Sequence, residues 1–403
     1  MLDDGRVLRL VLAVFASQAA FHAFTASLPV ALARAGVPDP QIGLIVGTAA
    51  LVQIPAAFAT GVVIDRVGGI RGFTAGGLAY VVGCVILLLP GVEPGGPTGP
   101  FLAARLFQGV GLAAILPAAL SLVPRLVAPA RRGFGIASIG SADNLTLVLI
   151  PPISLAVLAA TSLHGVAALG LVSVVAGLAM LRLVPRAFTS SGDETTEGGP
   201  SDVARRRLGF AFRRTWLRLI AIDLLYTVHW GVIIAFLPQR AEAAGANIGL
   251  FFVADGIAIL LTRVPTGWLA DRIRPVILVL VGLAAIACAV LVLTLPPTTP
   301  LLIIAGSLTG SGGGLVITPL LIEVSRRSRS ADRGSAFSLF SASSAAALAM
   351  GSIGGGLVIA TAGFATAMLI TFAAIALAAI LAVLDAGLRR APTTVPVSDA
   401  APA

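Results

Sequence analysis

The chain has 403 residues, of which 57% are hydrophobic and 11% are charged, and its mean hydropathy is +1.01. Soluble domains carry roughly 25% charged residues, so this composition excludes a soluble globular protein and indicates a membrane protein. The net charge of +9 is the balance of 27 basic residues, all of them arginine, against 18 acidic residues. Because these arginines collect in short loops between apolar runs, the charge does not indicate binding of nucleic acid.

The apolar sequence divides into runs that are long enough to cross the hydrocarbon core, which requires about 20 residues per helix. Lipid offers no partners to backbone polar groups, and the runs lack the alternation of barrel strands, so we expect an all-α integral membrane protein. The first run is longer than the apolar part of a signal peptide and is expected to remain as the first span. The twelve predicted spans are 7–33, 41–64, 72–90, 100–124, 133–160, 163–184, 216–238, 247–270, 275–296, 300–322, 334–361 and 363–387.

Arginine marks one side of the membrane. It occurs at the N-terminus and on alternate loops, whereas the opposite loops hold only Arg34 and Arg240. The positive-inside rule therefore predicts that both termini are cytoplasmic. We expect a multi-pass protein of the cell membrane, either an inner or a plasma membrane.

A hydrophilic segment near the middle of the chain separates the first six predicted spans from the last six. It begins with a Ser-, Thr- and Gly-rich stretch that cannot bury enough apolar surface to fold, and it becomes arginine-rich around Arg206. It is either a flexible tether or an interfacial helix that places Phe210, Phe212 and Trp216 against anionic lipid. The predicted organisation is a six-helix bundle (1–185), a cytoplasmic linker (186–215), a second six-helix bundle (216–390) and a disordered cytoplasmic tail (391–403).

One seven-residue pattern occurs in both halves of the chain. It reads Thr60-Gly61-x-x-x-Asp65-Arg66 in the first half and Thr266-Gly267-x-x-x-Asp271-Arg272 in the second. Each copy stands where a long apolar run ends and a short charged turn begins. The repeat predicts two similar halves in tandem, and since both start on the same side, they are related by an axis along the membrane normal. Such halves enclose a site near the middle of the membrane.

Three segments resemble signatures of the major facilitator superfamily. Gly61-Val-Val-Ile-Asp65-Arg66-Val-Gly68-Gly-Ile-Arg71 resembles its loop signature between spans two and three, and Gly267-Trp-Leu-Ala-Asp271-Arg272 repeats it between spans eight and nine. Arg105-Leu-Phe-Gln108-Gly109-Val-Gly111 resembles its span-four signature. The resemblance covers essentially the whole chain. It implies a monomeric transporter with twelve transmembrane helices in two pseudo-symmetric six-helix bundles, which works by alternating access.

The sequence carries weaker signals for the energy source and the direction of transport than for the fold. No segment resembles a nucleotide-binding loop, so we expect a proton gradient to drive transport and expect no cofactor. Antiporters of the superfamily often carry a Gly- and Pro-rich signature in span five. This chain keeps Pro151-Pro152 there but lacks the surrounding glycines.

The repeated loop signature predicts a gate on the cytoplasmic side. Glycine one turn before the helix end permits another helix to come close. The aspartate lies at a helix C-terminus, where the dipole disfavours a carboxylate, so it needs an arginine or the N-terminus of another helix as its partner. We expect a latch that holds this side closed in one state without touching substrate. Its residues are Gly61, Asp65, Arg66, Gly68 and Arg71 in the first half and Gly267, Asp271 and Arg272 in the second.

Eight polar residues inside the predicted spans are candidates for binding substrate or protons. Ionisable groups at membrane depth cost roughly 2.5–3.5 kcal/mol each and usually mark a pathway or a proton relay. The superfamily's fold places spans three, six, nine and twelve against lipid, and the candidates fall on other spans. They are His22, Arg105, Asp143, Asn144, Asp223, His229, Asp255 and Arg263. Glu323, close to the cytoplasmic end of span ten, is expected to anchor a loop.

Asp143 is the strongest of these candidates. It lies about ten residues into span five, roughly 15 Å deep at the rise of a helix, beside Asn144 and before Pro151-Pro152. A carboxyl at that depth can load and release a proton, or it can be a fixed hydrogen-bond partner for Arg105 or a serine.

Two further helices carry candidate pairs. Asp255 and Arg263 are eight residues apart on one predicted helix, so they either form a structural ion pair or bind a charged substrate. Asp223 lies one turn before Thr227, which gives span seven a polar inner face.

The leading interpretation is a proton-coupled transporter that exports drug-like or metabolite compounds, with protons, the lipid bilayer and a small-molecule substrate as its partners. The alternative is a proton-coupled symporter that imports a sugar, a carboxylate or another nutrient, with Arg105 and Arg263 binding an anionic group. A third interpretation is a membrane sensor without solute flux. Because no cluster resembles a nucleophile–base pair or a metal site, an enzyme is not expected.

Overall fold

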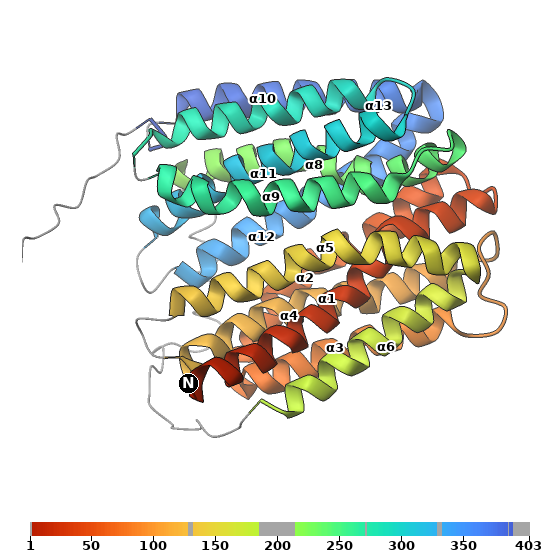
Figure 1. Ribbon diagram of the computed structural model, residues 1–403, viewed down its shortest axis with the longest axis horizontal. Coiled ribbons are helices and arrows are strands. Elements are labelled where there is room, and N and C mark those ends of the chain that lie inside the picture. The colour runs from red at the N-terminus through yellow and green to blue at the C-terminus, as the bar shows by residue number, and fades with distance from the viewer. Residues whose placement is uncertain are drawn as a thin grey trace, which may run out of the picture.

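The computed structural model describes residues 2–127, 132–184, 214–270, 272–328, 333–385 and 387–389 of the chain. Within these ranges the secondary structure is helical, joined by short turns (Figure 1). The linker (186–215, apart from its last two residues), the tail (391–403) and Asp271 lie outside the described residues, as do the side chains of Asp65 and Trp216. The elements are α1 (Leu2–Arg34), α2 (Asp39–Val67), α3 (Gly69–Leu87), α4 (Thr98–Leu126), α5 (Arg132–Ala160), α6 (Leu163–Arg182), α8 (Arg214–Ala243), α9 (Ile248–Ala270), α10 (Pro275–Leu293), α11 (Thr299–Arg327), α12 (Arg333–Ala349), the π-helical segment η3 (Met350–Gly354) and α13 (Gly355–Leu384).

Local sequence explains where several helices begin and end. Ser162 accepts a hydrogen bond from the backbone N–H of His164 (3.2 Å) and so caps α6. Proline stands in the first two positions of α2, α10 and α11, where no intrahelical N–H is needed. Gly68 ends α2 with a φ of 87°, a conformation that disfavours other residues. The observed helices agree with the predicted spans to within a few residues at most ends.

Eleven helical stretches among the described residues are long and apolar enough to cross a membrane. The last of them, Leu339–Leu384, has 46 residues, about twice the number that one span requires. Gly363 lies inside it with a φ of 82° and interrupts the helical geometry. This is the position at which the sequence predicts one span to end and the next to begin.

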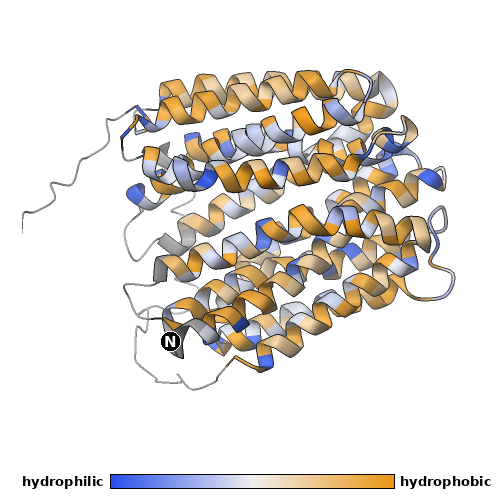
Figure 2. Cartoon of the chain, in the orientation of Figure 1, coloured by the Kyte–Doolittle hydropathy of each residue, from blue (hydrophilic) through white to orange (hydrophobic). Residues whose placement is uncertain are grey.

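Hydrophobic residues predominate along the helices (Figure 2), and the buried ones include small, aliphatic and aromatic side chains. Large hydrophobic residues are exposed around the bundle; Leu261 is 69% exposed and Val172 is 66% exposed. A surface of this kind is suited to lipid rather than to water. The chain is therefore a multi-pass membrane protein with an all-helical fold.

The helices pack chiefly with neighbours from their own half of the chain. In the first half α1 packs against α5 and α6, α3 against α4 and α6, and α2 against α4. In the second half α9 and α10 pack against α11, and α8 packs against α12 and α13. The halves meet where α1 contacts α8, α5 contacts α9, and α2 contacts α12, η3 and α13.

Contacts between the halves gather at one end of the bundle. We call this end the loop face; it is formed by the turns at 35–38, 88–97, 161–162, 244–247 and 294–298, on the right in Figure 1. Arg34 pairs with Glu242 there, and Gln239 donates a hydrogen bond to Asp39 (2.9 Å). The opposite end, where α1 begins, is the terminal face. The hydrogen bonds and ion pairs described between α1–α6 and α8–α13 all lie near the loop face.

Glycines bring backbones together where the two halves meet. A Cβ atom on Gly43 would lie 3.1 Å from Cζ of Phe236 and would overlap the carbonyl oxygen of Ser352. A Cβ atom on Gly356 would lie 2.7 Å from the carbonyl oxygen of Asp39. Side chains at these positions would force the helices apart. The glycine seam, as we name it, consists of Gly43, Gly47 and Gly356.

Replacing Gly43 by valine should prevent full closure of the loop face, because the added atoms would collide with the backbone of Ser352. Closure can be measured by cross-linking cysteines introduced as Arg34→Cys and Glu242→Cys, since these residues form an ion pair. We expect the yield to fall severalfold in Gly43→Val. The matched control is Gly354→Val, where a Cβ would meet nothing within 4 Å. Equal yields in the two variants would contradict this role of Gly43.

Candidate functional site

Asp143 is held by two side chains of α1. Gln18 donates a hydrogen bond to its Oδ1, and Nε2 of His22 lies 3.7 Å from the same oxygen. Gln18 and His22 are one helical turn apart, so they face α5 together. We call these three residues the Asp143 cluster. The sequence also allowed Arg105 or a serine as a fixed hydrogen-bond partner of Asp143. Among the described residues the partners are instead Gln18 and His22.

The Asp143 cluster combines burial with access. The His22 side chain is 10% exposed, but the Asp143 side chain is 33% exposed although it lies in the middle of a helix. Asn144, the next residue along α5, is 9% exposed. Arg263 of α9 is close enough for its charge to act on the Asp143 carboxyl. The cluster therefore has a carboxyl that can be reached and a cation from the other half in its surroundings.

Arg105 holds α4 against α2. Its Nη1 donates to Oε1 of Gln108 (2.9 Å) and its Nη2 donates to the carbonyl oxygen of Val46 (3.1 Å). Its Nε is buried without a hydrogen-bond partner among the described residues. Arg105 also lines a cavity of about 40 Å³ that includes Thr25 and Gln53 from the first half and Ser352 from the second. This volume accommodates a few water molecules.

Asp223 is fully buried between α8 and α12. Its Oδ2 accepts hydrogen bonds from the hydroxyl groups of Ser343 and Ser344, the latter at 2.8 Å. Its Oδ1 has no hydrogen-bond partner among the described residues. The sequence pointed to Thr227 beside Asp223 but not to the serine pair, because only packing shows which residues of another helix face a given side chain.

His229 is also buried on α8. Its Nδ1 contacts the carbonyl oxygen of Tyr226, so this nitrogen carries the proton and donates. Nε2 is then an acceptor, and it has no partner among the described residues.

Asp255 and Arg263 do not form an ion pair, so the structural pairing considered from the sequence is wrong. Eight residues correspond to about 12 Å along a helix, which is too far for direct contact. Asp255 is 4% exposed and its backbone packs against Gly310 of α11. The charge of Arg263 instead acts on Asp143 of α5 and on Tyr226 of α8.

The predicted gate residues lie on the terminal face, and the structure describes only part of them. Arg66 and Arg71 are exposed, and Gly68 forms the turn between α2 and α3. Arg272 lies over the ring of Trp268, 3.4 Å from its centroid. The latch itself stays a prediction, since Asp271 and the Asp65 side chain lie outside the described residues.

Close helix approach occurs beside the signature glycines rather than at Gly267. A Cβ atom on Gly267 would meet nothing within 4 Å among the described residues, so the predicted approach at this position is wrong. A Cβ on Gly69 would lie 2.9 Å from the carbonyl oxygen of Ala118, and one on Gly76 would lie 2.7 Å from Cβ of Ala114. These glycines bring α3 against α4. A single signature glycine does not reveal which side of its helix is packed.

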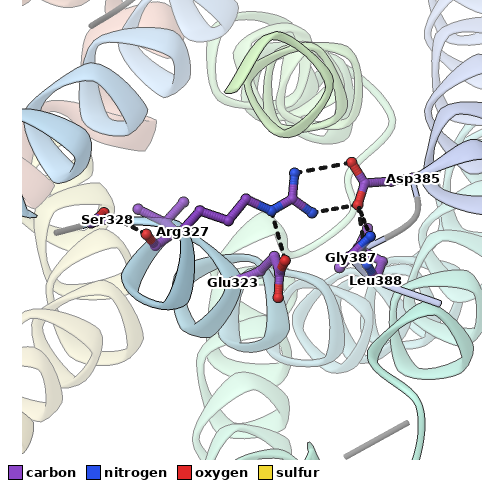
Figure 3. A network of polar contacts seen from close by, with 7 residues as sticks. Glu323, Arg327, Ser328, Asp385, Gly387 and Leu388 are labelled. Atoms are coloured by element: carbon purple, nitrogen blue, oxygen red, sulfur yellow. Dashed lines mark hydrogen bonds and ion pairs between the residues drawn. The ribbon is translucent and has the colours of Figure 1, made fainter. Parts of the chain in front are cut away.

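A second polar network fixes the terminal face of the second half (Figure 3). Arg327 donates through Nε to Glu323 (2.6 Å) and through Nη1 and Nη2 to Asp385, with 3.1 Å for Nη1. Asp385 also accepts from the backbone N–H groups of Gly387 (2.9 Å) and Leu388 (3.1 Å). Glu323 thus anchors the segment after α13, which agrees with its predicted role near a loop.

The charge state of Asp385 follows from this network. Burial raises its pKa, but the hydrogen bonds from Arg327, Leu388 and Gly387 and the arginine charge outweigh burial, so the pKa lies below its ordinary value of 3.8. A lowered pKa means that the carboxylate stabilises the folded protein above pH 3.8, and that this stabilisation is lost as the pH falls through the folded-state pKa.

Comparison with known proteins identifies the architecture. The family described as Major Facilitator Superfamily matches residues 10–247 and 224–401. A human organic anion transporter has a similar structure, with a TM-score of 0.70 and 17% identity over 95% of this chain and 100% of that one. A peptide transporter in complex with alafosfalin gives a TM-score of 0.75 and 17% identity over 95% of both chains. A nucleoside transporter gives 0.71 and 11% over 96% of this chain and 100% of that one. At these identities the structural likeness establishes the fold.

Replacing Asp385 by asparagine should lower the stability of the protein by about 3 kcal/mol, because it leaves the buried Arg327 charge with fewer acceptors. The measurement is thermal unfolding of the purified protein at neutral and at acid pH. The difference from the unmodified protein should shrink at acid pH, where Asp385 itself becomes protonated. Glu93→Gln, at a carboxylate whose side chain is 62% exposed, is the control and should change stability little. A difference that does not depend on pH would contradict the charge-based explanation.

Proposed function

We propose that this chain, which belongs to the Major Facilitator Superfamily, is a proton-coupled transporter that exports small drug-like or metabolite compounds by alternating access. The observation that carries the proposal is the Asp143 cluster, a partly exposed carboxyl inside a membrane helix beside an imidazole. Ionisable groups at this depth are costly and usually serve a pathway. Transport then needs a proton gradient and no cofactor.

The proposed architecture has twelve transmembrane helices in two bundles, 1–185 and 216–390, that work as a monomer. Gly363 supports the count of twelve, because it divides a 46-residue stretch into two parts of sufficient length. The packing of helices within each half supports the two bundles. The arginines of the terminal face support cytoplasmic termini in an inner or plasma membrane.

The distribution of contacts between the two halves supports alternating access. The halves are joined at the loop face by the glycine seam, the Arg34–Glu242 pair and the Gln239–Asp39 hydrogen bond. A conformation closed at that face admits substrate from the terminal face, on the cytoplasmic side, as an exporter requires. The reverse conformation must break these contacts and close the terminal face, where the residues of the predicted gate lie.

Competition between a proton and the neighbouring cationic groups for the Asp143 carboxyl supports proton coupling. An ionised Asp143 attracts His22 and Arg263, whereas a protonated Asp143 has no net charge and releases both. The arrangement of α1 relative to α5, and of one half relative to the other, then differs between the two protonation states of Asp143. This difference is what a coupled transporter requires, since a ligand shifts a conformational equilibrium only by its differential affinity.

The alternative function is a proton-coupled symporter that imports a sugar, a carboxylate or another nutrient. Arg105 and Arg263 favour it, because neither forms an ion pair with an acidic residue among the described residues. The two would then bind an anionic group of the substrate, as cations without a protein partner are suited to do. Lower cellular accumulation of a compound on expression indicates export, and higher accumulation indicates import.

Asp143→Asn should abolish the dependence of transport on an imposed pH gradient, because asparagine keeps the hydrogen-bonding shape but cannot take up a proton. A growth-inhibition and accumulation panel first identifies a transported compound, and its uptake into inverted membrane vesicles is then measured with and without the gradient. The matched control is Glu93→Gln, which changes a carboxylate that also lies near an imidazole (3.6 Å from His164) but outside the bundle interior. Gradient-driven uptake that survives in Asp143→Asn would refute proton coupling through this residue.

A further inference from the structure

A second carboxyl, Asp223, has surroundings of a different kind from Asp143. Asp223 is 0% exposed, whereas the Asp143 side chain is 33% exposed. Its surroundings are hydroxyl groups: Ser343 and Ser344 of α12 both reach the same oxygen, and Thr227 of α8 lies beside the carboxyl. No imidazole or guanidinium group contacts it among the described residues.

Among the described side chains, no cation of α8 or of the helices packed against it pairs with Asp223. On α8 itself the nearest ionisable residues are Arg218, which donates to the carbonyl oxygen of Leu384 (2.8 Å), and Tyr226. The described side chains of α12 and α13 include no ionisable group. The remaining ionisable residues on the helices packed against α8 are Arg6, Arg9, His22 and Arg34 on α1, Asp39 and Arg66 on α2, Asp255 and Arg263 on α9, and Glu323, Arg326 and Arg327 on α11. None of them forms an ion pair with Asp223.

A buried carboxylate without a cation is expensive, and here Oδ1 has no hydrogen-bond partner that the described residues supply. A neutral carboxylic acid avoids most of this cost. The geometry therefore favours the protonated form of Asp223 in this conformation.

The serine hydroxyls can serve both forms of the carboxyl. Each has a second acceptor, the carbonyl oxygen of Phe340, at 2.7 Å for Ser343 and 3.3 Å for Ser344. A hydroxyl has one proton to donate and can also accept. When Asp223 is ionised, both serines can donate to it. When Asp223 is protonated, its O–H can donate to a serine oxygen while that serine donates to Phe340.

We propose that Asp223, Ser343 and Ser344 form a second proton-binding site, occluded in this conformation, in which the two serines position the carboxyl and adapt to its protonation. The proposal rests on proton coupling as the function, and it adds a site in the second half to the Asp143 cluster in the first. Taking up a proton converts the Asp223 carboxylate to the acid without any other covalent change. Because the serines belong to α12, the same event alters the bonding between α8 and α12.

Infrared difference spectroscopy of the purified protein in lipid tests the site directly, since a neutral carboxylic acid has a C=O band that a carboxylate lacks. The spectrum needs neither substrate nor gradient, so its outcome is independent of the vesicle assay. Asp223→Asn should remove a C=O band that persists in Asp143→Asn. Asp255→Asn serves as the reference for another strongly buried carboxyl. An Asp223→Asn spectrum that retains every acid band of the unmodified protein would overturn the proposal.

The serines have a readout that a merely structural role would not move. Removing both hydroxyls in Ser343→Ala/Ser344→Ala should shift the Asp223 band to higher frequency, because hydrogen bonds weaken a carbonyl. Ser341→Ala, an exposed serine of the same helix, should leave the band in place. An unshifted band in the double variant would rule out the positioning role.

Exchange of the proton is tested on the unmodified protein with isotope-labelled aspartate, which also covers the case in which Asp223→Asn does not fold. The band that shifts in the serine double variant should disappear reversibly as the pH is raised. A band that persists at every pH at which the protein stays folded would show a permanently neutral structural residue and would overturn the proton site.

Discussion

The structure depends on one constraint: a charged group surrounded by hydrocarbon needs a partner supplied by another helix. Asp143 of α5 takes its partners from α1, Arg105 of α4 donates to the backbone of α2, and Asp223 of α8 accepts from α12. Each of these contacts joins two helices within one half of the chain. The costly residues thus fix the neighbours inside each half and leave the boundary between the halves to weaker contacts.

Different kinds of contact hold the two ends of the bundle. At the loop face, glycines allow direct contact of backbones, and an exposed ion pair adds little stability in water. Toward the terminal face, the Glu323–Arg327–Asp385 network holds α11 to the segment after α13 within the second half. Parting the loop face therefore requires no loss of a buried charge pair, whereas deforming the second half does.

The fold was largely predictable from the sequence, because the length of an apolar run is a strong signal and arginine and glycine mark its ends. The predicted spans coincide with the helices, and the break at Gly363 falls where two spans were separated. The candidate site was less predictable. Spacing along one helix shows which residues share a face, but it does not show what that face meets. Gln18 and the serine pair were therefore not assigned as partners, and Asp255 and Arg263 were wrongly considered as an ion pair.

The glycine seam has a consequence for how the loop face parts. Long side chains can follow a retreating neighbour and keep a gap partly filled, but glycine has nothing to extend. Because dispersion forces fade within a fraction of an ångström to an ångström of separation, the backbone contacts of Gly43 and Gly356 are lost together once the helices part. A contact sealed in this way changes abruptly between closed and parted, because the glycines themselves cannot bridge the gap as it widens.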